Sequence, residues 1–327
     1  MEFRKLGNSD IDVSVITFGA WAAGGWMWGS TDRKEAIEAI KASYHEGVTS
    51  IDTAPIYGQG VSEEIVGETI KGIPRDKVQL LTKFGMRWDL EQPKGILAMH
   101  SKNNEGLPID IYKYAGKESV IKETEASLKR LGTDYIDLMQ IHWPDVTTPI
   151  DETMEALEIL IQQGKIRAAG VSNYTTDQVK EARHTLGVVS NQVPYSMLNR
   201  GIEQELVPYA QANNLSIIAY SPMERGLLTG KYFNTITLQE GDHRNQYFKN
   251  FDLEKAKSFL NQIEPLAKEK RASLSQLVLR WTSLQPAITV VLAGARNATQ
   301  AIENAKAIQV NLSQDELQFI REELDKI

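Results

Sequence analysis

The sequence predicts a (β/α)8 TIM barrel, and three observations lead to this fold class. Eight short apolar segments are each followed by an amphipathic helical pattern along the 327 residues. The apolar segments are nearly continuous, which is typical of parallel strands that are buried on both faces. Eight is also the number of strand–helix units that closes such a barrel, and a single barrel domain can occupy the whole range 1–327.

A doubly wound open sheet is the alternative fold for alternating strands and helices. Its dinucleotide-binding form needs a G-x-G-x-x-G turn directly after the first strand. The nearest match is "GQGVSE", which begins at Gly58 and lacks the third glycine. The barrel is therefore favoured.

The chain opens with two alternating stretches, "FRKLG" and "IDVSV", which are separated by the turn residues "NSD". We expect them to pair as a hairpin that plugs one end of the barrel. The strands predicted after the hairpin are, in order, "VITFGAW", "VTSIDTA", "VQLLTKFG", "YIDLMQIH", "IRAAGVSN", "VVSNQV", "LSIIAYSP" and "AITVVLAG". The helices that follow them are "RKEAIEAIKASYHEG", "SEEIVGETIKG", "KESVIKETEASLKRLG", "IDETMEALEILIQQG", "TTDQVKEARHTLG", "IEQELVPYAQANN", "SLSQLVLRWTSLQ" and "NATQAIENAKAI". Gly47, Gly132 and Gly164 are expected to end three helices, and Ser62 to be the N-cap of the second.

Two segments do not fit the repeat. Residues 86–115 interrupt the third unit, and residues 222–270 interrupt the seventh with an extra helix near "LEKAKSFLNQIEPLAKEK". Loops of this length in a compact domain are usually functional. We expect both on the face that carries the carboxyl ends of the strands, where barrel active sites lie. The stretch "AAGGWMWG" shows little periodicity and predicts a loop with aromatic walls.

Composition excludes several classes of function. The chain has no cysteine, so no disulfide framework, thiolate chemistry or cysteine-ligated metal is possible. Its 36 basic and 43 acidic side chains give a formal net charge of −7, which argues against nucleic-acid binding. The first residues contain no apolar signal region, and no apolar run approaches the length of a membrane span. We expect a soluble, cytoplasmic protein with a small-molecule partner, no bound metal and no membrane contact.

Polar side chains gather at the predicted carboxyl ends of the strands. One such residue alone is explained most simply by packing: Asp52 and Lys83 as a structural ion pair, His142 as a core histidine, Tyr57 as part of a loop. However, seven of the predicted strands end this way, and their ends meet at one mouth of a barrel. The residues are Asp52 with Tyr57, Lys83, His142, Ser172 with Asn173, Gln192, Tyr220 with Ser221, and Gly294 with Arg296.

An aspartate, a lysine, a tyrosine and a histidine around one mouth suit proton transfer. Tyrosine has an ordinary pKa of about 10, and a nearby ammonium is expected to lower the pKa of Tyr57. Asp52 would hold Lys83, and His142 would polarise a carbonyl. Tyr57 would then protonate the carbonyl oxygen as hydride attacks its carbon. An aldolase or isomerase that uses Lys83 as a Schiff-base nucleophile is an alternative.

At these motifs the chain resembles the aldo-keto reductase family over essentially its whole length. The matching segments are "IDTAPIYGQGVSEEIVG", "LLTKFG", "LKRLGTDYIDLMQIHWPD" and "GKIRAAGVSNY". "GLLTGKY" and the terminal "GARN" block are similar to those of bacterial members close to the general-stress and inositol-operon aldo-keto reductases. The resemblance implies that Asp52, Tyr57, Lys83 and His142 are catalytic, and that Trp21, Trp26, Tyr57, His142 and Trp143 form the substrate pocket.

The resemblance also implies a nicotinamide cofactor. In that family Ser172, Asn173 and Gln192 would hold the carboxamide, Tyr220 would stack on the nicotinamide ring, and Lys231 and Arg244 would contact phosphates. The full set of implied cofactor residues is Trp21, Asp52, Ser172, Asn173, Gln192, Tyr220, Ser221, Pro222, Met223, Arg225, Gly226, Lys231, Arg244, Gly294, Arg296, Gln300, Glu303 and Asn304. Many members carry a lysine for the 2′-phosphate where this chain has Gly294 and Ala295. Arg296 is the nearest cation and can clamp a phosphate, which favours NADPH over NADH.

The same family resemblance extends to certain channel β-subunits, which bind the cofactor in a regulatory role. Such proteins lack the histidine at position 142. Retention of His142 therefore favours an NADPH-dependent reductase of aldehydes and ketones over a regulatory subunit.

Overall fold

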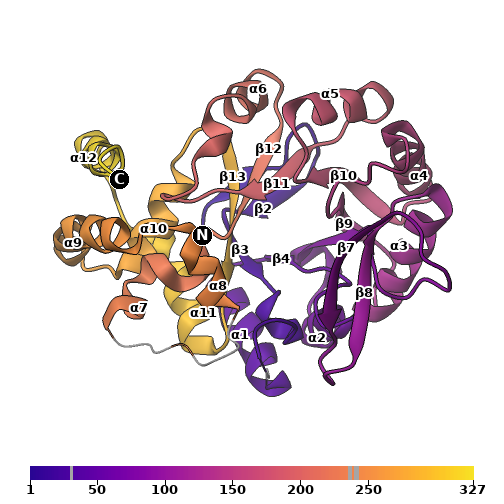
Figure 1. Ribbon diagram of the computed structural model, residues 1–327, viewed down its shortest axis with the longest axis horizontal. Helices are drawn as coiled ribbons and strands as arrows, with labels where there is room; N and C mark the ends of the chain where they lie inside the picture. Colours follow the sequence, from indigo (N-terminus) through magenta and orange to yellow (C-terminus); the bar gives the residue numbers. More distant parts are fainter. Residues whose placement is uncertain (30–31, 235–237, 239–242) are drawn as a thin grey trace.

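The computed structural model describes residues 1–29, 32–234, 238 and 243–327. Eight parallel strands close into a barrel in the order β10-β11-β12-β13-β3-β4-β5-β9, so the predicted fold is confirmed. Figure 1 looks into this barrel, with the helices arranged around it. The strands are β3 (Ile16–Gly19), β4 (Ser50–Asp52), β5 (Gln79–Phe84), β9 (Ile136–Ile141), β10 (Ile166–Ser172), β11 (Ser190–Pro194), β12 (Ser216–Tyr220) and β13 (Ile288–Gly294).

Each barrel strand is followed by a helix in the predicted order. These helices are α1 (Arg33–His45), α2 (Val61–Ile70), α3 (Lys117–Leu131), α4 (Ile150–Gln162), α5 (Thr176–Thr185), α6 (Leu206–Ala212), α10 (Leu274–Ser283) and α11 (Ala298–Ala305). Gly132 ends α3 in the left-handed conformation (φ 64°), where a side chain would be strained. Gly47 and Gly164 also have positive φ just beyond α1 and α4, as predicted.

The prediction that Ser62 caps α2 is wrong. Gly60 is the N-cap and Val61 begins the helix, so Ser62 lies inside its first turn. The Ser62 hydroxyl is fully buried; it donates to Ala20 O at 2.8 Å and lies 2.8 Å from the Thr53 hydroxyl. It therefore ties α2 to the strand ends instead of capping the helix's own backbone.

The N-terminal hairpin closes the barrel as predicted. Strands β1 (Phe3–Lys5) and β2 (Asp12–Ser14) pair antiparallel. Leu6, Ile11 and Val13 are fully buried and pack against inward-facing residues of five barrel strands. A β-carbon on Gly7, which has φ +55°, would lie 2.4 Å from Val189 O, so only glycine lets the hairpin approach this closely.

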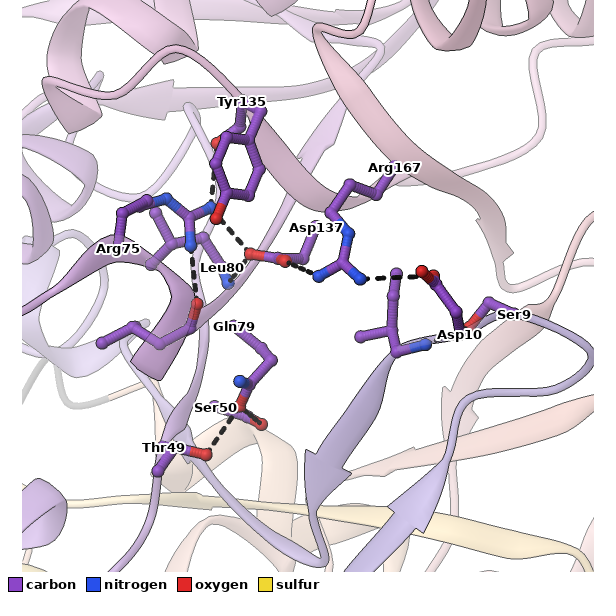
Figure 2. Close-up of polar contacts among 12 residues, drawn as sticks. Ser9, Asp10, Thr49, Ser50, Arg75, Gln79, Leu80, Tyr135, Asp137 and Arg167 are labelled. Atoms are coloured by element: carbon purple, nitrogen blue, oxygen red, sulfur yellow. Dashed lines mark hydrogen bonds and ion pairs between the residues drawn. The ribbon is translucent and has the colours of Figure 1, made fainter.

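A set of ion pairs fixes the same end of the barrel (Figure 2). Asp137 on β9 is 1% exposed and accepts bonds from Arg75 and Arg167, each at 2.7 Å. It also accepts from Leu80 N of the neighbouring strand at 2.9 Å. Arg167 in turn pairs with Asp10 of the hairpin turn at 3.2 Å. This network joins the plug to the barrel wall.

The segment 86–115 forms a second sheet outside the barrel. Strands β6 (Met86–Arg87), β7 (Ile96–Lys102) and β8 (Pro108–Lys113) pair antiparallel in the order β6-β8-β7. In Figure 1, β7 and β8 form a long ribbon near the barrel rim.

The second interruption, 222–270, contains α7 (Lys231–Asn234), α8 (Arg244–Tyr247) and the expected extra helix α9 (Leu253–Glu269). Residues 235–237 and 239–242 of this segment lie outside the described residues. Helix α12 (Gln314–Leu324), near the end of the chain, was not among the predicted helices. Within the described part of the chain, every helix is too short or too polar to cross a bilayer.

Candidate active site

One cavity of about 660 Å³ opens among the carboxyl ends of the barrel strands. Every residue assigned to the site from the sequence lines it, with one exception. The predicted residues that line the cavity are Trp21, Trp26, Asp52, Tyr57, His142, Trp143, Ser172, Asn173, Gln192, Tyr220, Ser221, Pro222, Met223, Arg225, Gly226, Lys231, Arg244, Gly294, Arg296, Gln300, Glu303 and Asn304. The exception is Lys83, which is fully buried behind Asp52.

Lys83 and Asp52 form a buried ion pair between neighbouring strands β5 and β4. Lys83 Nζ donates to Asp52 Oδ1 at 2.6 Å and to Thr53 O at 2.9 Å. The second carboxylate oxygen, Asp52 Oδ2, accepts from Gln192 Nε2 at 2.8 Å. Lys83 Nζ also lies 5.1 Å from the centre of the Tyr57 ring. The ammonium is thus held in place by Asp52 and Thr53, with its charge beside Tyr57.

The Tyr57 hydroxyl is subject to two opposed effects. Burial raises its pKa above the ordinary value, while the Lys83 ammonium lowers it, and the net direction is upward. The expectation that Lys83 would bring the pKa of Tyr57 below its ordinary value is therefore not met. Burial destabilises the phenolate more than the Lys83 ammonium stabilises it. Burial would lower the pKa of Lys83, but Asp52 and Tyr57 raise it, and the net direction is again upward. At neutral pH Tyr57 carries its proton and Lys83 its charge.

His142 follows directly after β9, and its backbone N donates to Phe84 O of β5 at 3.0 Å. Its ring stands edge-on to Tyr57, with 5.8 Å between ring centres. Burial and the charge of Lys83 hold the pKa of His142 well below its ordinary value. The imidazole is therefore neutral at neutral pH and can donate one N–H into the cavity.

A chain of hydrogen bonds connects these groups to the tips of β10 to β12. Asn173, which adopts φ 60°, donates from Nδ2 to His142 O at 3.0 Å and to Ser172 Oγ at 3.1 Å. Its Oδ1 accepts from the Tyr220 hydroxyl at 2.9 Å. A left-handed conformation at a strand tip is tolerated by asparagine better than by most residues. It fixes the direction of the Asn173 side chain over the mouth.

The connection after β12 has an unusual backbone and a stacked cation. Glu224, Arg225 and Gly226 all have positive φ (46°, 54° and 99°). The Arg225 guanidinium lies 3.7 Å from the centre of the Tyr247 ring and 5.3 Å from that of Trp21. Its Nε is buried and has no hydrogen-bond partner among the described residues. A cation with an unsatisfied buried donor at the wall of a cavity is suited to an anionic ligand.

The sequence profile described as the aldo/keto reductase family matches residues 15–325. The chain belongs to the aldo/keto reductase family. It is 41% identical over 305 residues to the aldo-keto reductase YhdN of Bacillus subtilis, covering 92% of this chain and 86% of the relative. It is 37% identical to the NADH-specific methylglyoxal reductase of Escherichia coli, covering 98% of both. The solved glycerol dehydrogenase of Gluconobacter oxydans superimposes with a TM-score of 0.87 at 34% identity, covering 99% of this chain and 95% of the other.

As a member of the aldo/keto reductase family, the protein is an oxidoreductase. The enzymes of this family use nicotinamide cofactors. Several hydrogen-bond donors and cations line the cavity of this aldo-keto reductase. Arg296 also lines the cavity, and it donates from Nη2 to Trp28 O at 2.9 Å. Its backbone N donates to Gln300 Oε1 at 3.0 Å, at the N-terminus of α11. Backbone N–H groups and an arginine at a helix N-terminus suit a phosphate.

Several lining residues of this reductase were not anticipated. Met86 and Met99 come from the sheet outside the barrel, and Met27 and Ile56 from loops after β3 and β4. The alternation in "PIDIYK" was a signal for a strand pair in 86–115, but it could not show which face meets the cavity. Tyr247 does not line the cavity, but its ring holds Arg225 there; it was not predicted, because this contact joins α8 to the loop after β12.

Proposed function

We propose that this aldo-keto reductase reduces aldehydes and ketones to alcohols by hydride transfer from NADPH, with Tyr57 as the general acid. The observation that carries the proposal is the position of Tyr57. Its ring lines the cavity, with its centre 5.1 Å from Lys83 Nζ and 5.8 Å from the centre of the edge-on His142 ring. The name of the Escherichia coli relative, a methylglyoxal reductase, supports aldehyde reduction.

In the proposed reaction the cofactor, when bound, supplies hydride to the carbonyl carbon. The neutral His142 ring donates an N–H to the carbonyl oxygen and orients it. As negative charge builds on that oxygen, Tyr57 transfers its phenolic proton to it and the alcohol forms. The Lys83 ammonium stabilises the phenolate that remains, and Asp52 keeps Lys83 aligned at 2.6 Å. Solvent then returns a proton to Tyr57.

The cofactor would be held along the mouth by this chain's own side chains. Ser172, Asn173 and Gln192 would bind the carboxamide, and the Tyr220 ring, whose hydroxyl donates to Asn173, would stack on the nicotinamide ring. Arg225, Lys231 and Arg244 line the cavity and would contact the phosphates. Arg296, Gln300, Glu303 and Asn304 also line the cavity and would bind the adenosine part of the cofactor.

Two other functions are less well supported. A Schiff-base aldolase needs Lys83 as a free amine facing the substrate, but Lys83 is fully buried, and its pKa is raised by Asp52 and Tyr57. A purely regulatory cofactor-binding subunit has no use for the polarising His142, which here lies beside Tyr57.

The test is Tyr57→Phe assayed with NADPH and NADH against a small set of aldehydes and ketones. Loss of a general acid reduces the rate by roughly 10² to 10⁴-fold. Cofactor binding, followed by quenching of tryptophan fluorescence, should be retained. A variant that keeps the wild-type kcat would remove Tyr57 from the acid role, and a wild type inactive on every carbonyl would refute the reductase.

The preference for NADPH rests on Arg296. A 2′-phosphate there would gain a charge-assisted hydrogen bond, worth about 1.5 to 3 kcal/mol, or roughly ten- to over a hundredfold in affinity. Arg296→Ala should weaken NADPH binding by that factor and leave the NADH dissociation constant nearly unchanged. Lys306, an exposed cation at the C-terminus of the same helix, provides the control as Lys306→Ala. Equal weakening of both cofactors would show that Arg296 does not read the 2′-phosphate.

A further inference from the structure

The small sheet β6-β8-β7 has two faces of different character. Where β7 pairs with β8, Met99 lies opposite Ile111 and Leu97 lies opposite Tyr112. Neighbouring residues of β8 point to opposite faces of the sheet, so Met99 and Leu97 also lie on opposite faces. On one face Met86 and Met99 line the cavity, and Ile111 is fully buried. On the other, His100 and Asp110 form an ion pair at 2.7 Å with side chains 77% and 52% exposed. One face of the sheet therefore belongs to the cavity.

Two hydrogen bonds fix the sheet to the aromatic loop, residues 22–29. Trp26 Nε1 donates to Ser101 Oγ at 3.2 Å. Asn104, in the turn between β7 and β8, donates from Nδ2 to Gly24 O at 2.8 Å. Trp26, Ile56, Met86 and Ile111 form one buried apolar cluster. These contacts make the sheet a built wall of the cavity.

Charge divides the cavity into two halves. Among the described residues, every charged side chain of the lining comes from β4, from the chain after β12 or from the chain after β13: Asp52, Arg225, Lys231, Arg244, Arg296 and Glu303. The aromatic loop 22–29 and the small sheet contribute Trp26, Met27, Trp28, Met86 and Met99 to the lining, and all five are uncharged. Trp28 lies at the boundary with the charged half, because the Arg296 guanidinium is 5.4 Å from the centre of its ring. Both halves meet at Tyr57 and His142.

We infer that the sheet β6-β8-β7 is the wall for the substrate's tail, and that the preferred substrates are uncharged carbonyl compounds with an aryl or alkyl tail. The inference rests on the proposed function, because Tyr57 and His142 define where the carbonyl lies. A tail that leaves the carbonyl away from the charged half meets tryptophan rings and thioethers. Methionine side chains are flexible and polarisable, so such a wall accepts tails of several shapes. A carbonyl of two or three carbons would not extend past Tyr57 and His142 far enough to use it.

The first experiment compares propanal with 3-phenylpropanal, which share the same reacting group and differ by one ring. Burial of apolar surface contributes roughly 25 cal/mol per Å², so a seated ring should raise kcat/KM by about tenfold or more. Equal kcat/KM for the two aldehydes would overturn the inference while leaving the reductase intact. Failure to reduce either aldehyde, or any carbonyl, would instead refute the proposed function.

The second experiment changes the wall. Met99 is 37% exposed, so replacement should not prevent folding. Met99→Gln keeps the length of the side chain but makes it polar, and it should lower kcat/KM for 3-phenylpropanal about three- to tenfold while propanal changes less than twofold. Met99→Leu should restore the wild-type preference. Leu97→Gln, on the opposite face and 40% exposed, is the matched control and should change neither value. An equal loss for both aldehydes in Met99→Gln, or the same loss in Leu97→Gln, would contradict the assignment.

A binding measurement tests the wall separately from turnover. The dissociation constant of 3-phenylpropanol, followed by tryptophan fluorescence, should increase about three- to tenfold in Met99→Gln and stay unchanged in Leu97→Gln. An unchanged constant in Met99→Gln would show that the tail lies elsewhere, whether or not the protein reduces aldehydes.

Discussion

Strand β5 is held at each end by a buried carboxylate, and the two carboxylates differ in how their charge is balanced. At the plugged end, Asp137 accepts from Leu80 N at 2.9 Å. At the open end, Glu123 of α3 accepts from Gly85 N at 2.9 Å. Asp137 has two guanidinium groups at 2.7 Å, from Arg75 and Arg167. Glu123 has one guanidinium at 3.6 Å, from Arg87, together with the Ser119 hydroxyl at 3.0 Å.

Asp52, the last residue of β4, is another buried carboxylate, with Lys83 as its cation. Burial and an ion partner are therefore common to both ends of the barrel and do not by themselves mark a functional site. What distinguishes Asp52 and Lys83 is that their neighbours Tyr57 and His142 line a cavity, whereas Asp137 lies among backbone groups and arginines. This agrees with the division of labour in such barrels, where the carboxyl ends of the strands carry the chemistry and the other end carries stability.

The largest effect is expected at the plugged end. Asp137→Ala removes the acceptor for both arginines and for Leu80 N, and loss of one partner of a buried ion pair costs about 3 to 5 kcal/mol. We expect the free energy of unfolding to fall by that amount, while kcat of the folded enzyme changes less than twofold. Denaturant unfolding and steady-state kinetics measure the two quantities. Asp76→Ala, whose side chain is 70% exposed, is the control and should have little effect. If Asp137→Ala kept the wild-type stability but lost activity, Asp137 would belong to the catalytic site and not to the structural end of the barrel.

At the open end, Lys83→Met should act mainly on the rate. Removing one electrostatic stabiliser of a developing charge typically costs 10² to 10³-fold in kcat, or about 2.7 to 4 kcal/mol. Without the ammonium, burial and the charge of Asp52 both raise the pKa of Tyr57, so this pKa rises further. Alcohol oxidation requires the phenolate, so its pH profile should shift to higher pH in the variant. If the pH profile did not shift and the variant lost much of its stability, Lys83 would have a structural role, as Asp137 does. Lys77→Met, with a side chain 64% exposed, controls for the loss of a surface charge.

The sequence was sufficient for the barrel because each strand and helix carries its own local pattern, and glycines such as Gly132 punctuate the pattern. It failed where the outcome depended on contacts distant in sequence. Ser62 is of the residue type that caps helices, but a carbonyl 42 residues away captures its hydroxyl. Helix α12 begins with a capping box at Ser313 and Glu316, so the sequence does contain a start signal for this helix, although it lies beyond the eighth strand–helix unit.

In the candidate site, too, some features could be predicted from the sequence and others depend on the folded structure. Polar residues at strand ends could be placed together from topology alone, since parallel strands bring their carboxyl ends to one mouth. The pKa of Tyr57 could not be predicted, because its direction depends on whether burial or Lys83 dominates, and burial is a property of the folded protein. The role of the 86–115 segment was equally out of reach, since Met99 meets the cavity only through the register of β7 on β8.

The last of the three effects is a dependence of stability on pH, and it concerns Glu123. Burial raises its pKa from 4.5 to about 7, although Arg87 and the Gly85 N–H lower it. The folded protein therefore holds a proton that the unfolded chain releases between these two values. The stability that this carboxyl contributes is fully present below pH 4.5 and is lost as the pH rises to about 7. Over this interval the loss is on the order of 3 kcal/mol.

Glu123→Gln, which can still accept from Gly85 N, should remove this dependence. Relative to the wild type, its free energy of unfolding should rise between pH 5 and pH 8 by up to that amount, as followed by denaturant unfolding at each pH. Glu125→Gln, two residues along α3 with a side chain 52% exposed, should track the wild type at every pH. A parallel pH dependence in Glu123→Gln and the wild type would mean that the single guanidinium of Arg87 balances Glu123 as fully as two guanidiniums balance Asp137. The difference between the two ends of β5 would then lie in geometry alone.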